Sequence, residues 1–311
     1  MTVDLAAVAA AQERIRPHIV HTPLLPGGEL AARLHMELSF KAEYRQRTGS
    51  FKLRGALNAS LRKPDAVGFV AVSSGNHGAA VAYAATLQHK PAVIVMPEDS
   101  SPDKIALVSS LGAQIIREGV TVANREEVVT AVQQSTGFTL IHPFNDEDVI
   151  AGQGTLALEM LADAPPPETI YVAVGGGGLI SGIATVMKAL HPETRIIGVE
   201  PAAADDAARS FAAGKLVALD APPTTVADAV RTMHLGSLTF PILLTKVDAV
   251  LTVSEVDIVR THELLLSHLG ERIEPTAALA CAPLLSPSTE HPASAWVILC
   301  GGNWHGTTVP A

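Results

Sequence analysis

Three short segments carry more glycine and small polar residues than packing alone requires. They are residues 48–52 (TGSFK), 73–78 (SSGNHG) and 175–178 (GGGG). The four glycines follow an apolar run and open an Ala/Ile-rich one, so they would expose backbone N–H groups beside a helix N-terminus, where the helix dipole favours an anion such as phosphate. The run matches neither the dinucleotide fingerprint nor the P-loop. A phosphate is therefore expected there, and a nucleotide is not indicated.

The other two segments carry side chains that could bind a carboxylate or react with an aldehyde. The hydroxyls and amide of 73–78, with the free donors of a helix start, could hold a carboxylate or could only cap the helix. Lys52 is one charge in a small, largely apolar neighbourhood ahead of the helical segment 53–61. A lysine desolvated there would have a lowered pKa, as a Schiff-base amine needs, whereas an exposed lysine would keep its ordinary pKa.

The elements that must position these residues alternate along the chain. Short β-branched runs predict strands at 38–43, 67–72, 92–96, 114–117, 139–142, 170–174, 195–200, 249–253 and 296–299. Ala/Leu-rich segments predict helices at 78–87, 101–111, 124–134, 152–161, 179–190 and 255–269. This alternation predicts an α/β fold with parallel sheets joined by right-handed crossovers.

The composition limits the class of protein. The chain has 311 residues, of which 48% are hydrophobic and 17% charged, and its net charge is -9. This length corresponds to about two domains. No Lys/Arg-rich block occurs, so neither nucleic acid nor an anionic membrane is expected as a partner. No apolar run reaches the ~18 residues of a membrane span. The two cysteines and the absence of an export signal predict the cytoplasm.

Eight segments together resemble the fold-type II pyridoxal-phosphate enzymes, specifically the serine/threonine dehydratase and serine racemase branch. They occur in family order and cover nearly the whole chain: HTPL (21–24), TGSFKLRGA (48–56), SSGNHGAA (73–80), AGQGT (151–155), GGGG (175–178), GVEP (198–201), IEPT (273–276) and CGGN (300–303). The resemblance implies a two-domain α/β protein similar to the tryptophan synthase beta chain, each domain a mostly parallel sheet flanked by helices. It implies a large cofactor domain at 1–66 plus 147–311, a small substrate-closing domain at 67–146, and a homo-oligomer, a dimer.

The resemblance also implies roles for single residues. Lys52 would form a Schiff base with the aldehyde of pyridoxal 5'-phosphate and then remove the substrate's Cα proton, while Phe51 would pack beside the cofactor ring. Asn76 would hydrogen-bond the ring oxygen. The cofactor phosphate would bind the backbone N–H groups of Gly175, Gly176, Gly177, Gly178 and Leu179. The substrate carboxylate would bind Ser73, Ser74, Asn76 and His77.

Three further expectations follow from the resemblance. Cys300 would face the pyridine nitrogen without holding it protonated, which suits β-elimination better than transamination, whereas Cys281 is expected in the core. Arg125 aligns with an arginine near the active-site mouth of racemase relatives, or is only a solvated helix charge. A divalent cation, Mg²⁺ with Ca²⁺ or Mn²⁺ as substitutes, would bind three residues, unless their carboxylates only complement a helix dipole: Glu200, the carbonyl of Ala204, and Asp206.

The expected function is a cytoplasmic dehydratase (ammonia-lyase) that converts a small 3-hydroxy amino acid, L-threonine or L-serine, to a 2-keto acid and ammonia. No regulatory domain of the feedback-inhibited kind is expected after Asn303. Three alternatives stay open. They are a serine racemase, in which Ser74 serves the second face of the substrate, a 3-hydroxyaspartate dehydratase, and a catalytically silent amino-acid-binding protein on the same fold. Lys52 speaks against the last, because a silent relative needs no Schiff-base amine.

Overall fold

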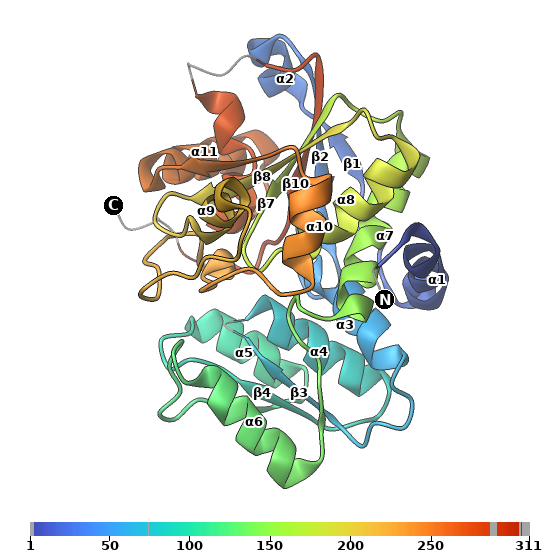
Figure 1. Cartoon of the computed structure of the whole chain (residues 1–311), viewed down its shortest axis with the longest axis vertical. Helices are drawn as coiled ribbons and strands as arrows, with labels where there is room; N and C mark the ends of the chain where they lie inside the picture. The colour runs from blue at the N-terminus through green and yellow to red at the C-terminus, as the bar shows by residue number, and fades with distance from the viewer. Residues whose placement is uncertain (1–2, 74, 287–290, 305, 307–311) are drawn as a thin grey trace.

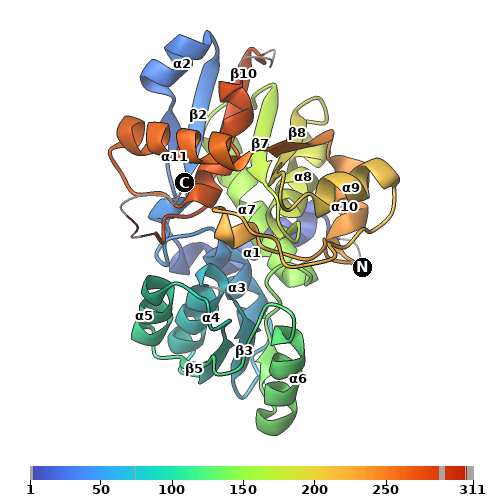
Figure 2. The same ribbon diagram turned by 90° about the vertical axis from the view of Figure 1, so that its left-hand side faces the viewer.

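The computed structural model describes residues 3–73, 75–286, 291–304 and 306, and its strands form two sheets (Figures 1 and 2). The larger sheet has the order β1 (Leu24–Pro26), β2 (Glu37–Ala42), β10 (Ser294–Leu299), β7 (Thr169–Ala173), β8 (Arg195–Pro201) and β9 (Ala249–Val253). All its neighbours are parallel except β1 and β2. The smaller sheet is wholly parallel, in the order β5 (Gln114–Ile116), β4 (Ala92–Val95), β3 (Phe69–Val72) and β6 (Thr139–Leu140). The expected α/β class is confirmed.

Helices flank both sheets, as buried parallel strands require. Figure 1 shows β3 and β4 with α4, α5 and α6 in the lower body, and the larger sheet with α7 to α11 above it. The helices are α1 (Leu5–Ile15), α2 (Gly28–Leu34), α3 (Lys52–Leu61), α4 (Asn76–Leu87), α5 (Pro102–Ser110), α6 (Arg125–Thr136), α7 (Glu147–Asp163), α8 (Gly178–Leu190), α9 (Asp206–Ala213), α10 (Thr239–Lys246), α11 (Glu255–Leu269) and α12 (Pro275–Leu279). Within the described ranges, no helix combines the length and the apolar character of a membrane span.

Helix α7 is longer than the expected 152–161. It begins at Glu147 because the Asp146 side chain accepts hydrogen bonds from the N–H groups of Asp148 and Val149 and so caps the helix. The sequence expectation started after this cap, at a glycine that lies inside the helix. Since α7 also packs against α3 and α8, the early start extends the scaffold beneath the reactive lysine.

The expected domain division stays a proposal. All four strands of the smaller sheet lie within residues 67–146. The apolar cluster that covers this sheet nevertheless includes Leu53, Ala56 and Leu57 of α3. Helix α3 therefore packs with the smaller sheet, although its residues precede the expected boundary at 66.

Candidate active site

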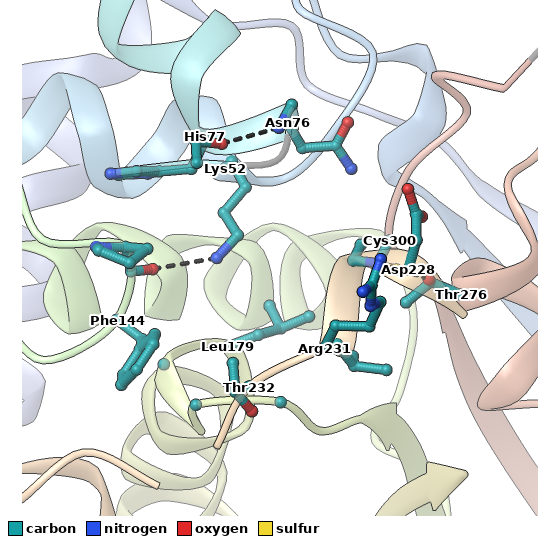
Figure 3. Close-up of a pocket in the computed structure, with 18 of the residues that line it drawn as sticks. Lys52, Asn76, His77, Phe144, Leu179, Asp228, Arg231, Thr232, Thr276 and Cys300 are labelled. Atoms are coloured by element: carbon teal, nitrogen blue, oxygen red, sulfur yellow. Dashed lines mark hydrogen bonds between the residues drawn. The ribbon is translucent and has the colours of Figure 1, made fainter. Parts of the chain in front are cut away.

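A cavity of about 110 Å³ brings together segments that are far apart in the sequence (Figure 3). Eleven residues expected at the site line it: Phe51, Lys52, Ser73, Asn76, His77, Gly175, Gly176, Gly177, Gly178, Leu179 and Cys300. Arg125 also lines it. Ser74 lies outside the described residues, so its expected role stays a prediction.

Lys52 is the first residue of α3, and its side chain extends into the cavity toward Pro143 (Figure 3). Its Nζ donates a hydrogen bond to the Pro143 carbonyl at 3.0 Å and lies 5.1 Å from the centroid of the Phe51 ring. Burial lowers the pKa of Lys52 to about 8, although Cys300 and Glu274 act in the opposite direction. An amine with this pKa is partly unprotonated near neutral pH, which a nucleophile toward an aldehyde needs.

The glycine run connects β7 to α8 beside this amine. Gly177 has a φ of +88°, a conformation that glycine adopts without strain, and a Cβ there would lie 2.9 Å from the Thr239 side chain. A Cβ at Gly176 would collide with the Phe144 ring, so the loop must stay without side chains. Thr239 Oγ1 donates to the Gly176 carbonyl at 2.7 Å. The backbone N–H groups at the start of α8 therefore border the cavity, as an anion site requires.

Ser73, Gly75, Asn76 and His77 line the cavity around the start of α4. The His77 ring donates Nε2–H to the Ile141 carbonyl at 2.8 Å, and burial lowers the pKa of His77 to about 3. The ring is therefore neutral, and its one N–H is already used. A carboxylate could bind the backbone N–H of His77 in the first turn of α4, but not the ring as a donor.

Sequence reasoning missed a polar network around Asn76. Asn76 Nδ2 donates to the Glu274 carboxylate at 2.8 and 3.1 Å, and Asn76 Oδ1 accepts from Asn303 Nδ2 at 2.8 Å. Lys104 Nζ lies 2.6 Å from Asp228 and 3.6 Å from Glu274. Glu274 and Asn303 fall within quoted motifs, but Glu274 before Pro275 reads as an ordinary helix start. Lys104 and Asp228 carried no signal, because only the fold brings them together.

Cys300 directly follows β10 and lines the cavity. Burial, and secondarily the charge of Glu274, raises the pKa of this thiol well above its usual range. Cys281 lies in the core, where burial raises its pKa to about 12. Both groups are therefore neutral thiols at physiological pH, as the sequence expectation for Cys300 requires.

The expected cation ligands lie at the end of β8 and the start of α9. Glu200 and Asp206 are both buried, and Glu200 accepts hydrogen bonds from the N–H groups of Ala207 at 3.1 Å and Ala208 at 2.8 Å. Asp206 Oδ2 has no partner among the described residues. Burial and then Asp206 raise the pKa of Glu200 to about 9. Two buried carboxylates with an unpaired oxygen fit a hard cation, although no cluster of three His, Cys, Asp or Glu side chains occurs in the described ranges.

The cavity meets the needs of pyridoxal phosphate at both ends of that molecule. Lys52 offers an amine of lowered pKa to an aldehyde, and the loop of glycines before α8 offers N–H donors to a phosphate. A reactive lysine in this arrangement between two parallel sheets is the pattern of fold-type II pyridoxal-phosphate enzymes.

Comparison with known proteins agrees with this pattern. The family model described as "Pyridoxal-phosphate dependent enzyme" matches residues 15–301, and the chain belongs to that family. It is 41% identical over 311 residues to a serine racemase of Oryza sativa subsp. indica, covering 96% of this chain and 91% of the relative. It is also 41% identical over 300 residues to the L-threo-3-hydroxyaspartate ammonia-lyase of Saccharomyces cerevisiae, covering 95% and 92%.

The solved structures place it in the same group. A crystal structure of a T.th. threonine deaminase has a TM-score of 0.95 and 48% identity, covering 98% of this chain and 99% of that one. The chain is therefore a fold-type II pyridoxal-phosphate enzyme of the ammonia-lyase and racemase group.

Proposed function

We propose that this enzyme eliminates the β-hydroxyl group of a small 3-hydroxy amino acid, L-threonine or L-serine, to yield a 2-keto acid and ammonia. The observation that carries the proposal is the Lys52 amine, which lies in the cavity with a lowered pKa. The names of the threonine deaminase and hydroxyaspartate ammonia-lyase relatives support elimination as the reaction.

When bound, the cofactor would supply an electron sink that makes the substrate's Cα proton acidic. The protein's own groups would do the rest. Lys52 would take that proton as general base. The donors at the start of α4 would orient the substrate carboxylate, and Asn76 would hydrogen-bond the cofactor ring oxygen. The neutral Cys300 thiol would leave the pyridine nitrogen without a carboxylate partner, which favours elimination over transamination.

Replacing the reactive amine tests the proposal. Lys52→Ala should lower keto-acid production by at least about 10³-fold and abolish the absorbance band of lysine-bound cofactor. Lys63→Ala, which removes a partly exposed lysine outside the cavity, is the matched control and should keep both properties. Near-normal keto-acid production by Lys52→Ala would refute the role of Lys52.

A second candidate substrate, 3-hydroxyaspartate, is favoured by the cations of the cavity. Arg125 and Arg231 both line it, and burial followed by the charge of Arg231 lowers the pKa of Arg125. Arg231 is hydrogen-bonded to Asp99 at 3.3 Å, whereas no hydrogen bond joins the Arg125 guanidinium to a described residue. Two neighbouring guanidinium groups would favour a substrate with a second carboxylate.

A substrate panel separates these candidates. kcat/KM for L-serine, L-threonine and L-threo-3-hydroxyaspartate should be measured for the wild type and Arg125→Met. Preference for the dicarboxylate that disappears selectively in Arg125→Met would establish the second candidate. Chiral analysis of the same reactions tests the racemase alternative, which fails if no D-serine forms while keto acid accumulates.

The cation site is also a proposal. The buried carboxylates of Glu200 and Asp206, with Ala204 in the turn between them, would bind Mg²⁺ or a substitute. The unpartnered Asp206 Oδ2 supports this assignment over a simple helix-dipole role, because a buried carboxylate oxygen without a donor is costly.

A further inference from the structure

A continuous line of hydrogen bonds runs through the amides of Asn303 and Asn76. Asn303 Nδ2 donates to the Thr48 carbonyl at 2.8 Å and also to Asn76 Oδ1 at 2.8 Å. Asn76 Nδ2 then donates to the Glu274 carboxylate. The line therefore connects the loop before Lys52, the start of α4 and the start of α12.

The two ends of this line determine the direction of every hydrogen bond in it. A backbone carbonyl and an ionised carboxylate can only accept hydrogen bonds. Asn303 must therefore turn its NH₂ group toward Thr48, and its remaining N–H meets the oxygen of Asn76. Asn76 in turn must direct its NH₂ group toward Glu274. One N–H of Asn76, shared between the two oxygens of the Glu274 carboxylate, can make both of these hydrogen bonds. The second N–H, rather than a carbonyl oxygen, is then available to a group bound in the cavity that Asn76 lines.

Charged and titratable groups from several elements surround Glu274. Its side chain is 1% exposed, and a Cβ at Gly301 would collide with its carboxylate. Lys104 of α5, itself buried, supplies a positive charge 3.6 Å away. The other charged or titratable groups facing it are Asp228, in the short helix Asp228–Val230, Cys300, directly after β10, and Lys52 of α3.

We propose that Glu274 is a positioning residue for the reaction proposed above, on which this inference rests. Its carboxylate fixes the orientation of the Asn76 carboxamide, and Lys104 is its countercharge. The cofactor's ring oxygen, as an acceptor, then meets an amide donor. Protonation of Glu274 removes one of the two acceptor-only ends, and the amide of Asn76 is then oriented by its hydrogen bond from Asn303 alone.

The variant Glu274→Gln keeps the shape and removes the charge. Cofactor dissociation constants should be measured by fluorescence titration of the apoprotein from pH 5.5 to 8.5. We expect the variant to bind pyridoxal phosphate at least tenfold more weakly than the wild type at pH 8.5, and equally at pH 5.5. Burial raises the pKa of Glu274 to about 7, against the effect of Lys104, so the difference should appear across this range. Comparing the two proteins cancels the titration of the free cofactor.

Glu271→Gln is the matched control, since it removes a carboxylate three residues away that pairs with Arg45 at the surface. It should bind the cofactor like the wild type at every pH. An affinity ratio between Glu274→Gln and the wild type that does not change with pH would overturn the proposal. An affinity ratio of one at every pH would also overturn it.

Asn303→Ala provides a second, independent test, including the case in which Glu274→Gln does not fold. Asn303→Ala removes the hydrogen bond to Asn76 Oδ1, and it should also weaken cofactor binding. In the double variant the two losses should not be additive, because both act on Asn76. Wild-type affinity in Asn303→Ala, or full additivity, would contradict the proposal. Failure of the proposed function is distinguishable, because the wild type would then form no keto acid from L-threonine or L-serine, whereas the cofactor affinities would still report on Glu274.

Discussion

The Lys52 amine has a pKa of about 8, and this value determines when it can react. At pH 7 about a tenth of such amines are neutral, compared with about one in three thousand for a lysine of ordinary pKa. The rate at which the apoprotein forms its covalent link to pyridoxal phosphate should therefore rise about fivefold between pH 7 and 8 and level off soon above pH 8. Stopped-flow absorbance measures this rate. A rate that still rises steeply to pH 10 would show an unperturbed lysine.

Single functional residues could be predicted from the sequence where a residue type has one main chemical use. Lys52 and the run Gly175 to Gly178 could be recognised because an amine in an apolar segment and four bare peptide groups are uncommon. The partners of Asn76 could not be predicted, since Glu274, Lys104 and Asp228 meet only through the tertiary fold. His77 was expected to bind the substrate carboxylate, and this stays a prediction; its ring is hydrogen-bonded to the Ile141 carbonyl, which leaves its backbone N–H as the donor for that role.

At the scale of elements, α3 is held by a buried ion network two residues after Lys52. The Arg54 guanidinium makes paired hydrogen bonds of 2.7 to 2.8 Å with the carboxylates of Glu43 and Glu159, and Lys41 lies 2.8 Å from Glu159. All four side chains are buried. This network connects α3 to β2 and α7 and so keeps the start of α3 in place.

Arg54→Met should lower the free energy of unfolding by about 3–5 kcal/mol, because it leaves the buried Glu43 carboxylate without its countercharge and Glu159 with Lys41 alone. Urea denaturation measures the change. The control is Arg45→Met, which breaks an ion pair with Glu271 whose side chains are 38% and 37% exposed, and which should cost less than about 1 kcal/mol. Equal effects of the two variants would show that the network contributes no more than a surface pair.

The turn from β8 to α9 provides a prediction for the cation. Millimolar Mg²⁺ should raise the melting temperature of the EDTA-treated wild type by several degrees, because a ligand that binds only the folded state stabilises it. Glu200→Gln should lose this shift, and Glu193→Gln, at an exposed carboxylate, should keep it. Differential scanning calorimetry measures the shift in melting temperature. An equal shift in Glu200→Gln would exclude Glu200 as a ligand.

Elements were predictable where their hydrophobic pattern is long or continuous. The strand 249–253 and the helix 255–269 have the predicted bounds. The short strand β1, of three residues, was missed. The apolar segment around Cys281 is not one continuous helix, since α12 ends at Leu279 and a separate 3-10 turn, Ala282–Leu285, follows with Pro283 in its first turn.

At the scale of the whole molecule, the larger sheet depends on the strand that comes last in the described chain. β10 lies between β2 and β7 and pairs with both in parallel. Ile298→Pro should abolish the cooperative unfolding transition, because proline cannot donate to the ladder of a central strand. Ile298→Ala, which only leaves a cavity, should fold with a loss of about 2–5 kcal/mol. Circular dichroism during thermal unfolding measures both, and a cooperative transition in the proline variant would contradict this dependence.

The same strand order has a consequence for synthesis on the ribosome. The four strands of the smaller sheet are complete by Leu140, so this body can begin to fold while the nascent chain is still growing. The larger sheet has no centre until β10 has emerged, and until then the edges of β2 and β7 offer unpaired peptide groups. While residues 141–293 are being synthesised, the nascent enzyme therefore carries a folded half and an aggregation-prone half, and chaperones would be needed during this interval.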